Sequence, residues 1–154
     1  MMCDGDLLRA VLDTNVIISG LMGLSGPPRS IIDAWLDDRF TLVTSVPLVR
    51  ELAHVLAYPR IAERLRFSQA EVDFLVAAML TQAEVVPGAL TLPGVTRDPK
   101  DDAVVACAVE GAAGFVVSGD EDLLVLSVYQ DVEMITPRAF VDMLEGATDR
   151  NECT

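Results

Sequence analysis

The chain has 154 residues, of which 51% are hydrophobic and 23% charged, and its 24 Asp and Glu against 11 Lys and Arg give a net charge of −13. This length suits one domain around a single core, and the hydrophobic content excludes a disordered protein. The charge excludes a general basic coat for nucleic acid, because counterion release needs clustered Lys and Arg. The acidic residues therefore either solubilise the surface or partly gather to hold a cation.

The cysteines and the apolar segments exclude several further classes. Cys3, Cys107 and Cys153 have no metal-ligand spacing, which argues against a zinc site and against a disulfide framework. We expect Cys107 to be a small buried residue. No segment has the pattern of a signal peptide or a membrane anchor, so we expect a cytoplasmic protein without membrane contact.

Strands and helices are predicted to alternate along the chain. Five short apolar runs predict buried strands, which in chain order cover residues 7–12, 41–44, 83–86, 115–118 and 132–135. Apolar residues at helical spacing predict helices over residues 28–36, 47–56, 69–80, 99–109, 122–126 and 137–144. This alternation predicts an α/β fold, a three-layer α/β/α sandwich with a central parallel five-stranded sheet. The domain is expected to cover residues 1–146, followed by a polar tail over 147–154.

Two of the predicted helices begin with clear local signals. Ser68 and Glu71 have the spacing of a capping box ahead of an apolar run. Asp98 is expected to be an N-cap, with Pro99 at the first helical position. Asp98 is therefore expected to cap its helix rather than to bind a ligand.

Acidic residues recur where the predicted strands end. Asp13 follows the first strand and Asp120 the fourth, Glu51 lies early in the helix after the second strand, and Asp101 and Asp102 begin the helix before the fourth. In a doubly wound sheet, sites form beyond the carboxyl ends of the strands. Two carboxylates about 4 Å apart repel by ~4 kcal/mol at an effective dielectric of ~20. Oxygen ligands favour hard ions, so Mg²⁺ or Mn²⁺ is the expected occupant.

Four segments resemble the motifs of PIN-domain nucleases, in the order and spacing of that family. They are residues 11–16 (VLDTNV), 45–52 (SVPLVREL), 102–108 (DAVVACA) and 117–124 (VSGDEDLL). With residues 97–102 (RDPKDD), the chain resembles the branch described as toxin components of bacterial and archaeal toxin–antitoxin pairs. The likeness covers about residues 7–145.

The resemblance implies a Mg²⁺- or Mn²⁺-dependent endoribonuclease, specific for single-stranded RNA, often homodimeric and silenced by an antitoxin protein. A metal-activated water would cleave the phosphodiester and leave a 5′-phosphate and a 3′-hydroxyl. Carried over residue by residue, the ligands, direct or through water, would be Asp13, Glu51, Asp102 and Asp120, with Asp122 as an accessory acid. Asn15 would orient Asp13 and water, and Ser118 would brace the site.

Two of these assignments have alternatives within the sequence. Asp101 fits the third helical position of a capping arrangement, but the family register and a face shared with Ala106 and Val109 favour Asp102 as the ligand. Asp122 is equally well interpreted as a second helix cap. His54, the single histidine, lies among apolar residues on a helix, and we expect it to be packed or at the surface rather than to act as a general base.

The cations are unevenly distributed. Residues 50–66 hold Arg50, Arg60, Arg64 and Arg66 against two acids. These arginines are candidates for contacts with RNA phosphates, and a solvated helix face is the alternative. The high hydrophobic share predicts a buried surface for a second copy or for an antitoxin helix.

Three other functions compete with the nuclease. A catalytically silent PIN-fold binding or regulatory module would keep the acidic pocket without turnover. An aspartate-nucleophile phosphatase fits less well, because Asn15 stands where its second Asp is needed and Lys100 is the single lysine. A receiver-type signalling domain also fits less well, because it needs a lysine late in the chain and this sequence has none there.

Overall fold

The computed structural model describes the backbone of residues 7–150 and the side chains of residues 7–146. Its sheet has the strand order β3-β2-β1-β4-β6-β5. The strands are β1 (Arg9–Leu12), β2 (Thr41–Ser45), β3 (Glu84–Val86), β4 (Phe115–Val117), β5 (Val128–Tyr129) and β6 (Val132–Ile135). The pairings are parallel except that β5 runs antiparallel to β6. The predicted α/β fold with a mostly parallel sheet is confirmed, and the two-residue β5 is an addition to the five predicted strands.

The helices are α1 (Thr14–Met22), α2 (Pro27–Leu36), α3 (Val46–Leu56), α4 (Pro59–Ala62), α5 (Gln69–Gln82), α6 (Pro99–Glu110), α7 (Glu121–Leu124) and α8 (Pro137–Arg150). The sequence analysis did not predict α1. Helix α8 continues beyond the predicted end at residue 144, so part of the expected polar tail is helical. The rest of that tail, residues 151–154, lies outside the described residues, as do Cys3 and Cys153.

Both predicted helix starts are confirmed. The Ser68 hydroxyl accepts a hydrogen bond from the Glu71 N–H at 3.1 Å, and the Glu71 carboxylate accepts one from the Ser68 N–H at 2.8 Å, which completes the capping box of α5. The Asp98 carboxylate accepts a hydrogen bond from the Lys100 N–H at 2.9 Å at the start of α6. These caps satisfy N–H groups that have no partner within their own helix.

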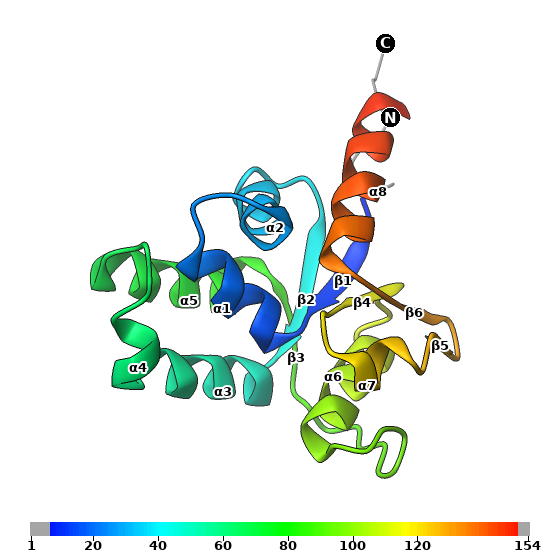
Figure 1. The fold of residues 1–154 in the computed structure, drawn as a ribbon. Helices are drawn as coiled ribbons and strands as arrows, with labels where there is room; N and C mark the ends of the chain where they lie inside the picture. Colours follow the sequence, from blue (N-terminus) through cyan, green and yellow to red (C-terminus); the bar gives the residue numbers. More distant parts are fainter. Residues whose placement is uncertain (1–6, 151–154) are drawn as a thin grey trace.

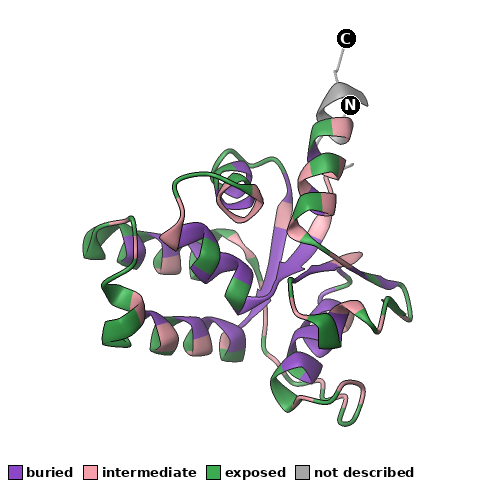
Figure 2. Ribbon diagram, viewed as in Figure 1, coloured by how far each residue is buried: buried purple, intermediate pink, exposed green. Residues whose placement is uncertain are grey.

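Helices cover both faces of the sheet (Figure 1). Alternate residues of β1 point to opposite faces, so Ala10 and Leu12 join one buried cluster and Val11 joins the other. The first cluster packs α1, α2, α3, α5 and α8 against the sheet, and the second packs α6 and α7 on the opposite face. Figure 2 shows the central strands β1, β2 and β4 largely buried between these layers. The structure is therefore the three-layer sandwich that the sequence predicts.

The strand order places the carboxyl ends of β1 and β4 side by side at the centre of the sheet. After β1 the chain crosses to β2 on one side, and β4 pairs with the other edge of β1. This reversal of strand order is the switch point at which ligands bind in doubly wound sheets. A backbone hydrogen bond from the Asp13 N–H to the Val117 carbonyl oxygen, at 3.0 Å, joins the two strands where they end.

Helix α1 packs closely on α2 because Gly20 has no side chain. A Cβ at Gly20 would lie 2.5 Å from the Ile32 Cδ1 and 2.8 Å from the Pro28 carbonyl oxygen. We expect Gly20→Ala to lower the free energy of unfolding by about 1–3 kcal/mol through overpacking. Gly114→Ala is the matched control, because a Cβ there meets nothing within 4 Å. Urea denaturation measures both, and equal stabilities would contradict this account of the α1–α2 contact.

Candidate metal centre

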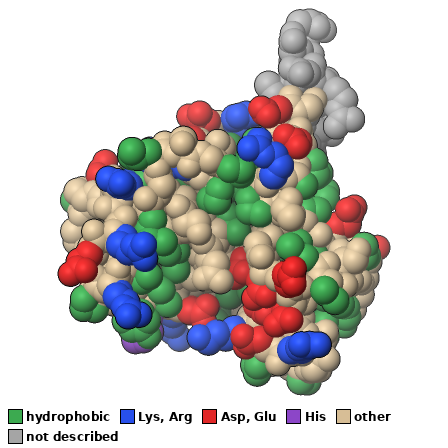
Figure 3. All heavy atoms as spheres, viewed as in Figure 1, with side chains coloured by type: hydrophobic (Ala, Val, Ile, Leu, Met, Phe, Trp, Pro, Cys, Tyr) green, Lys and Arg blue, Asp and Glu red, His purple; other side chains and the backbone are tan. Residues whose placement is uncertain are grey.

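Three carboxylates from distant parts of the sequence converge at the switch point. One oxygen from each of Asp13, Asp101 and Asp120 lies within 4.8 Å of the other two. Asp13 follows β1, Asp120 follows β4, and Asp101 lies in the first turn of α6. Asp13 and Asp101 are each only 6% exposed, and Asp120 is half-buried. Figure 3 shows acidic side chains gathered on this face, with basic side chains beside them.

Ser118 holds two of these residues in place. Its side chain is fully buried, and its hydroxyl donates a hydrogen bond to the Asp13 Oδ2 at 2.7 Å. The same hydroxyl oxygen accepts a hydrogen bond from the Asp120 N–H at 2.9 Å. Ser118 therefore lies where the resemblance implied a bracing residue.

Crowding and burial raise the proton affinity of the centre. Burial, together with the nearby charges of Asp120, Asp13 and Asp98, raises the pKa of Asp101 to about 7. Burial also raises the pKa of Asp13; the Ser118 hydroxyl acts in the opposite direction, and the Asp120 charge raises the pKa further. Among the described residues, no hydrogen-bond donor reaches the buried Oδ2 of Asp101. A buried anionic oxygen without a partner is costly unless a cation or a proton compensates it.

Asp102 does not belong to this group, and the expectation that it faces the site in place of Asp101 is wrong. Its carboxylate accepts hydrogen bonds from the Gly94 N–H at 3.1 Å, the Thr96 N–H at 2.6 Å and the Thr96 hydroxyl at 2.8 Å. Burial raises the pKa of Asp102, but these hydrogen bonds outweigh it and leave the pKa below its usual value. Asp102 therefore anchors the loop before α6 and needs no cation.

We expect Asp102→Ala to destabilise the fold because it removes three hydrogen bonds from that loop. Leaving donors without an acceptor costs about 1–3 kcal/mol, so we expect the free energy of unfolding to fall by about 2 kcal/mol. Urea denaturation in EDTA at pH 8 measures this change. Glu110→Ala is a useful comparison. The Glu110 carboxylate accepts hydrogen bonds from the Ala89 and Leu90 N–H groups of the same loop, but both are long, at 3.4 Å. A loss at Asp102 no larger than that at Glu110 would contradict the anchoring role.

The remaining predicted acids lie around the centre rather than in it. The Glu51 carboxylate accepts a long hydrogen bond from the Thr14 hydroxyl at 3.4 Å, on α3 beside α1. Asp122 is exposed, and its N–H donates to the Asp120 Oδ1 at 2.9 Å. Neither carboxylate is part of the group of three. The Asn15 side chain is exposed, and its nearby backbone N–H, with that of Thr14, lowers the pKa of Asp13.

The four candidate arginines are all exposed, but they do not lie together. Arg50 adjoins Glu51 on α3, whereas Arg60 lies on α4 and Arg64 and Arg66 follow it, beyond the far end of α3. Helix α3 has 11 residues, and at 1.5 Å per residue it is about 16 Å long. Among the residues that the structure describes, none of the four arginines forms an ion pair.

Two further expectations concern His54 and Cys107. His54 is exposed and makes an edge-to-face contact with Tyr58 at 5.1 Å between ring centroids, which confirms the expected surface position. Cys107 is buried as predicted, and burial raises the pKa of its thiol to about 12. Both side chains therefore have ordinary structural environments.

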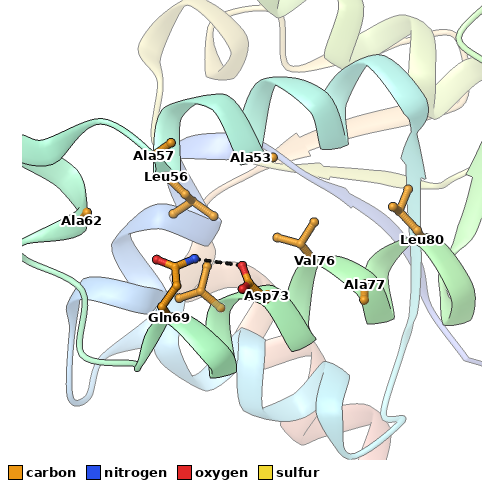
Figure 4. Close-up of a pocket in the computed structure, with 10 residues that line it drawn as sticks. Ala53, Leu56, Ala57, Ala62, Gln69, Asp73, Val76, Ala77 and Leu80 are labelled. Carbon is orange, nitrogen blue, oxygen red and sulfur yellow. Dashed lines mark hydrogen bonds between the residues drawn. The ribbon is translucent and has the colours of Figure 1, made fainter.

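A groove of about 460 Å³ lies away from the carboxylates, between α3 and α5 (Figure 4). Leu56, Val76 and Leu80 line it. Its one acidic side chain, Asp73, accepts a hydrogen bond from the Gln69 amide at 2.8 Å. This groove has no group suited to catalysis. In the described part of the chain, no helix has the length and apolar character needed to cross a membrane.

Comparison with known proteins identifies the family. The family model described as PIN domain matches residues 9–122, which include all three carboxylates. This chain belongs to the PIN domain family. It is also 27% identical over 146 residues to the uncharacterized protein MJ1680 of Methanocaldococcus jannaschii, with 90% of this chain and 92% of the relative covered. The acidic group of this PIN domain therefore fits a nuclease active site.

The donor set fits a hard divalent cation. Three carboxylates with close oxygens, one of them buried without a hydrogen-bond partner, match the oxygen ligands that Mg²⁺ and Mn²⁺ prefer. A bound dication would also relieve the repulsion that raises the pKa of Asp101. The geometry therefore supports a metal-binding centre.

Proposed function

We propose that this PIN domain is a metal-dependent endoribonuclease that hydrolyses single-stranded RNA. The observation that carries the proposal is the buried Oδ2 of Asp101, which has no hydrogen-bond partner among the described residues and lies beside the carboxylates of Asp13 and Asp120. These three residues would hold Mg²⁺ or Mn²⁺. Glu51 and Asp122 would act from the periphery through water.

The bound ion would lower the pKa of a water molecule and stabilise charge on the phosphoryl group. The chain's own residues supply the rest of the site. Ser118 fixes the Asp13 carboxylate by donating to its Oδ2. Arg50 would contact a phosphate close to the centre, and Arg60, Arg64 and Arg66 would contact the strand farther away. Such phosphate contacts position a strand but do not read its sequence.

Cleavage of a labelled single-stranded RNA in Mn²⁺ or Mg²⁺ tests the proposal. We expect EDTA-sensitive cleavage that leaves a 5′-phosphate, with a duplex of the same sequence uncut. The matched control is the double variant Asp13→Asn/Asp120→Asn, which removes two charges with little change in side-chain volume. Equal, EDTA-insensitive cleavage by both proteins would show contamination, and no cleavage by the wild type would leave the binding module as the better account.

We also propose that the protein is the toxin of a toxin–antitoxin pair, a homodimer whose activity an antitoxin protein blocks. The sequence motifs support this, and so do exposed apolar side chains that a protein partner would cover, such as Phe74 at 65% exposure and Leu80 at 49%. Induced expression should arrest bacterial growth, and Asp13→Asn should abolish the arrest. Arrest by both proteins alike would contradict a nuclease toxin.

A further inference from the structure

A second hollow, of about 350 Å³, opens directly beside the metal centre. It shares Asp120 with the centre. Its other walls come from four segments: Asn15 and Ser19 from α1, Pro28 from the start of α2, Gly119 from the β4–α7 connection, and Pro137 from the start of α8. A ligand whose phosphate contacts a metal ion at the carboxylates could therefore extend into this hollow without leaving the protein surface.

One wall of the hollow has unused hydrogen-bonding groups. Helix α1 is buried over most of its length, but Asn15 and Ser19 are exposed. Residues four apart lie on the same face of a helix, and both line the hollow. Neither side chain makes a hydrogen bond to another described residue. An amide offers two donors and one acceptor, and a hydroxyl offers one donor and two acceptor lone pairs.

The other walls are apolar and close together in the fold. Pro28 and Pro137 lie in the first turns of α2 and α8 and are both half-buried, and Val16 is a buried residue of α1 that lines the same hollow. Apolar walls with a few placed polar groups are typical of sites for small organic ligands. The lining contains no Lys, Arg or His, and its single charge is the carboxylate of Asp120. A second phosphate is therefore disfavoured, and an uncharged planar group is favoured.

Gly119 lines the hollow next to the centre. A Cβ at this position would meet nothing within 4 Å, and the residue is not among the glycines with positive φ. Neither steric crowding nor backbone conformation in the described structure requires a glycine here. Gly119 is a lining residue of the hollow, directly before Asp120, so a large side chain here would stand beside the metal centre.

We propose that this hollow binds the base of a nucleotide that adjoins the scissile phosphate. This inference rests on the proposed nuclease function and adds a base subsite to it. The base is the part of RNA that is uncharged, planar and rich in hydrogen-bonding edges, and it is covalently attached within reach of the phosphate. The Asn15 amide and the Ser19 hydroxyl bind its edge, and the proline and valine side chains contact its faces.

Cleavage of five-nucleotide RNAs in which each position in turn is abasic tests the subsite. In the wild type, we expect the abasic change at one position beside the cleaved bond to lower kcat/KM about tenfold, because the base's hydrogen bonds to Asn15 and Ser19 are lost. Gly119→Leu fills the hollow, so it should cleave the intact RNA about tenfold more slowly and lose the difference between intact and abasic substrates. Asn15→Ala should show a smaller loss of the same kind. Gly114→Ala is the control.

Two binding measurements separate failure of the subsite from failure of the nuclease. Mn²⁺ titration of Gly119→Leu by calorimetry should give the wild-type affinity, which shows that the centre is intact. Uridine and adenosine 5′-monophosphates, with Mn²⁺ present, should bind the wild type at least about fivefold more tightly than ribose 5-phosphate and lose this advantage in Gly119→Leu. Equal binding of nucleotides and ribose 5-phosphate by the wild type would overturn the subsite even if RNA is cleaved. Selective nucleotide binding without RNA cleavage would instead overturn the nuclease and keep a base-binding hollow.

Discussion

Replacing Asp101 with Asn should lower the rate of metal-dependent RNA cleavage by about 100-fold or more. Replacing a residue that only hydrogen-bonds to a metal ligand already lowers affinity or activity by about 10–100-fold. Asp101 contributes one of the three close oxygens itself. Asn keeps the volume of the side chain but removes its charge. The neighbouring Asp102→Asn should have a much smaller effect, because that carboxylate binds the loop rather than the centre.

Single-turnover cleavage at saturating Mn²⁺ and calorimetric Mn²⁺ titration measure this difference. The two variants are matched, since they change the same chemical group at adjacent positions of α6. Circular dichroism shows whether each variant is folded. A folded Asp102→Asn protein that loses as much Mn²⁺ affinity as Asp101→Asn would contradict the placement of the two residues.

The metal-free protein should become less stable between pH 4 and pH 7, and Asp101→Asn should remove much of this dependence. Burial and neighbouring carboxylates raise the pKa of Asp101 to about 7 from the ordinary value of 3.8. Over this range Asp101 keeps a proton in the folded state that it releases in the unfolded state. The stability that this proton provides is fully present below the pKa of Asp101 in the unfolded state, and it is lost as the pH rises through the pKa of Asp101 in the folded state. One pKa unit corresponds to about 1.4 kcal/mol, so the upper limit of the loss is about 4 kcal/mol.

Urea denaturation in EDTA at pH 5 and pH 8 measures this dependence for both proteins. We expect Asp101→Asn to be more stable than the wild type at pH 8 by about 2 kcal/mol or more, with a smaller difference at pH 5. Mn²⁺ at 100 times its Kd should restore about 2.7 kcal/mol to the wild type at pH 8. A difference between the two proteins that does not vary with pH would contradict the repulsion described here.

The sequence predicted the sheet and two of the three carboxylates because both depend on short-range patterns. Short apolar runs predicted the five main strands. Asp13 follows the first of them and Asp120 the fourth. Once the strands are parallel, their carboxyl ends meet at one edge of the sheet, so these two acids approach each other without further information. The cap at Asp98 is equally local, since it depends on a residue type and on the proline that follows.

The assignment of Asp102 failed because α6 is apolar on all sides. Asp101 shares its helix face with Val105 and Ala108, which are fully buried, whereas Asp102 shares its face with Ala106 and the half-buried Val109. A helix that is hydrophobic all round gives no periodic signal of which face meets the sheet. The loop that supplies the hydrogen bonds to Asp102 is a second contact that the pattern did not predict.

Helix α1 was missed for a related reason. Val16, Ile17 and Ile18 are β-branched residues that favour strands, and all three are buried, so the segment has no polar stripe beyond Asn15 and Ser19. Tertiary packing against α2 and α3 decides its conformation. The hollow beside the centre depends on that packing and on four separate segments, and for this reason the sequence did not predict it.

Diffraction from crystals grown in excess Mn²⁺, with anomalous differences recorded at the manganese edge, is the most direct test of the centre. The account predicts an anomalous peak in coordination contact with Asp13, Asp101 and Asp120, and none at Asp102. A fully ordered centre without a peak, or a peak bound by Asp102 instead of Asp101, would contradict it.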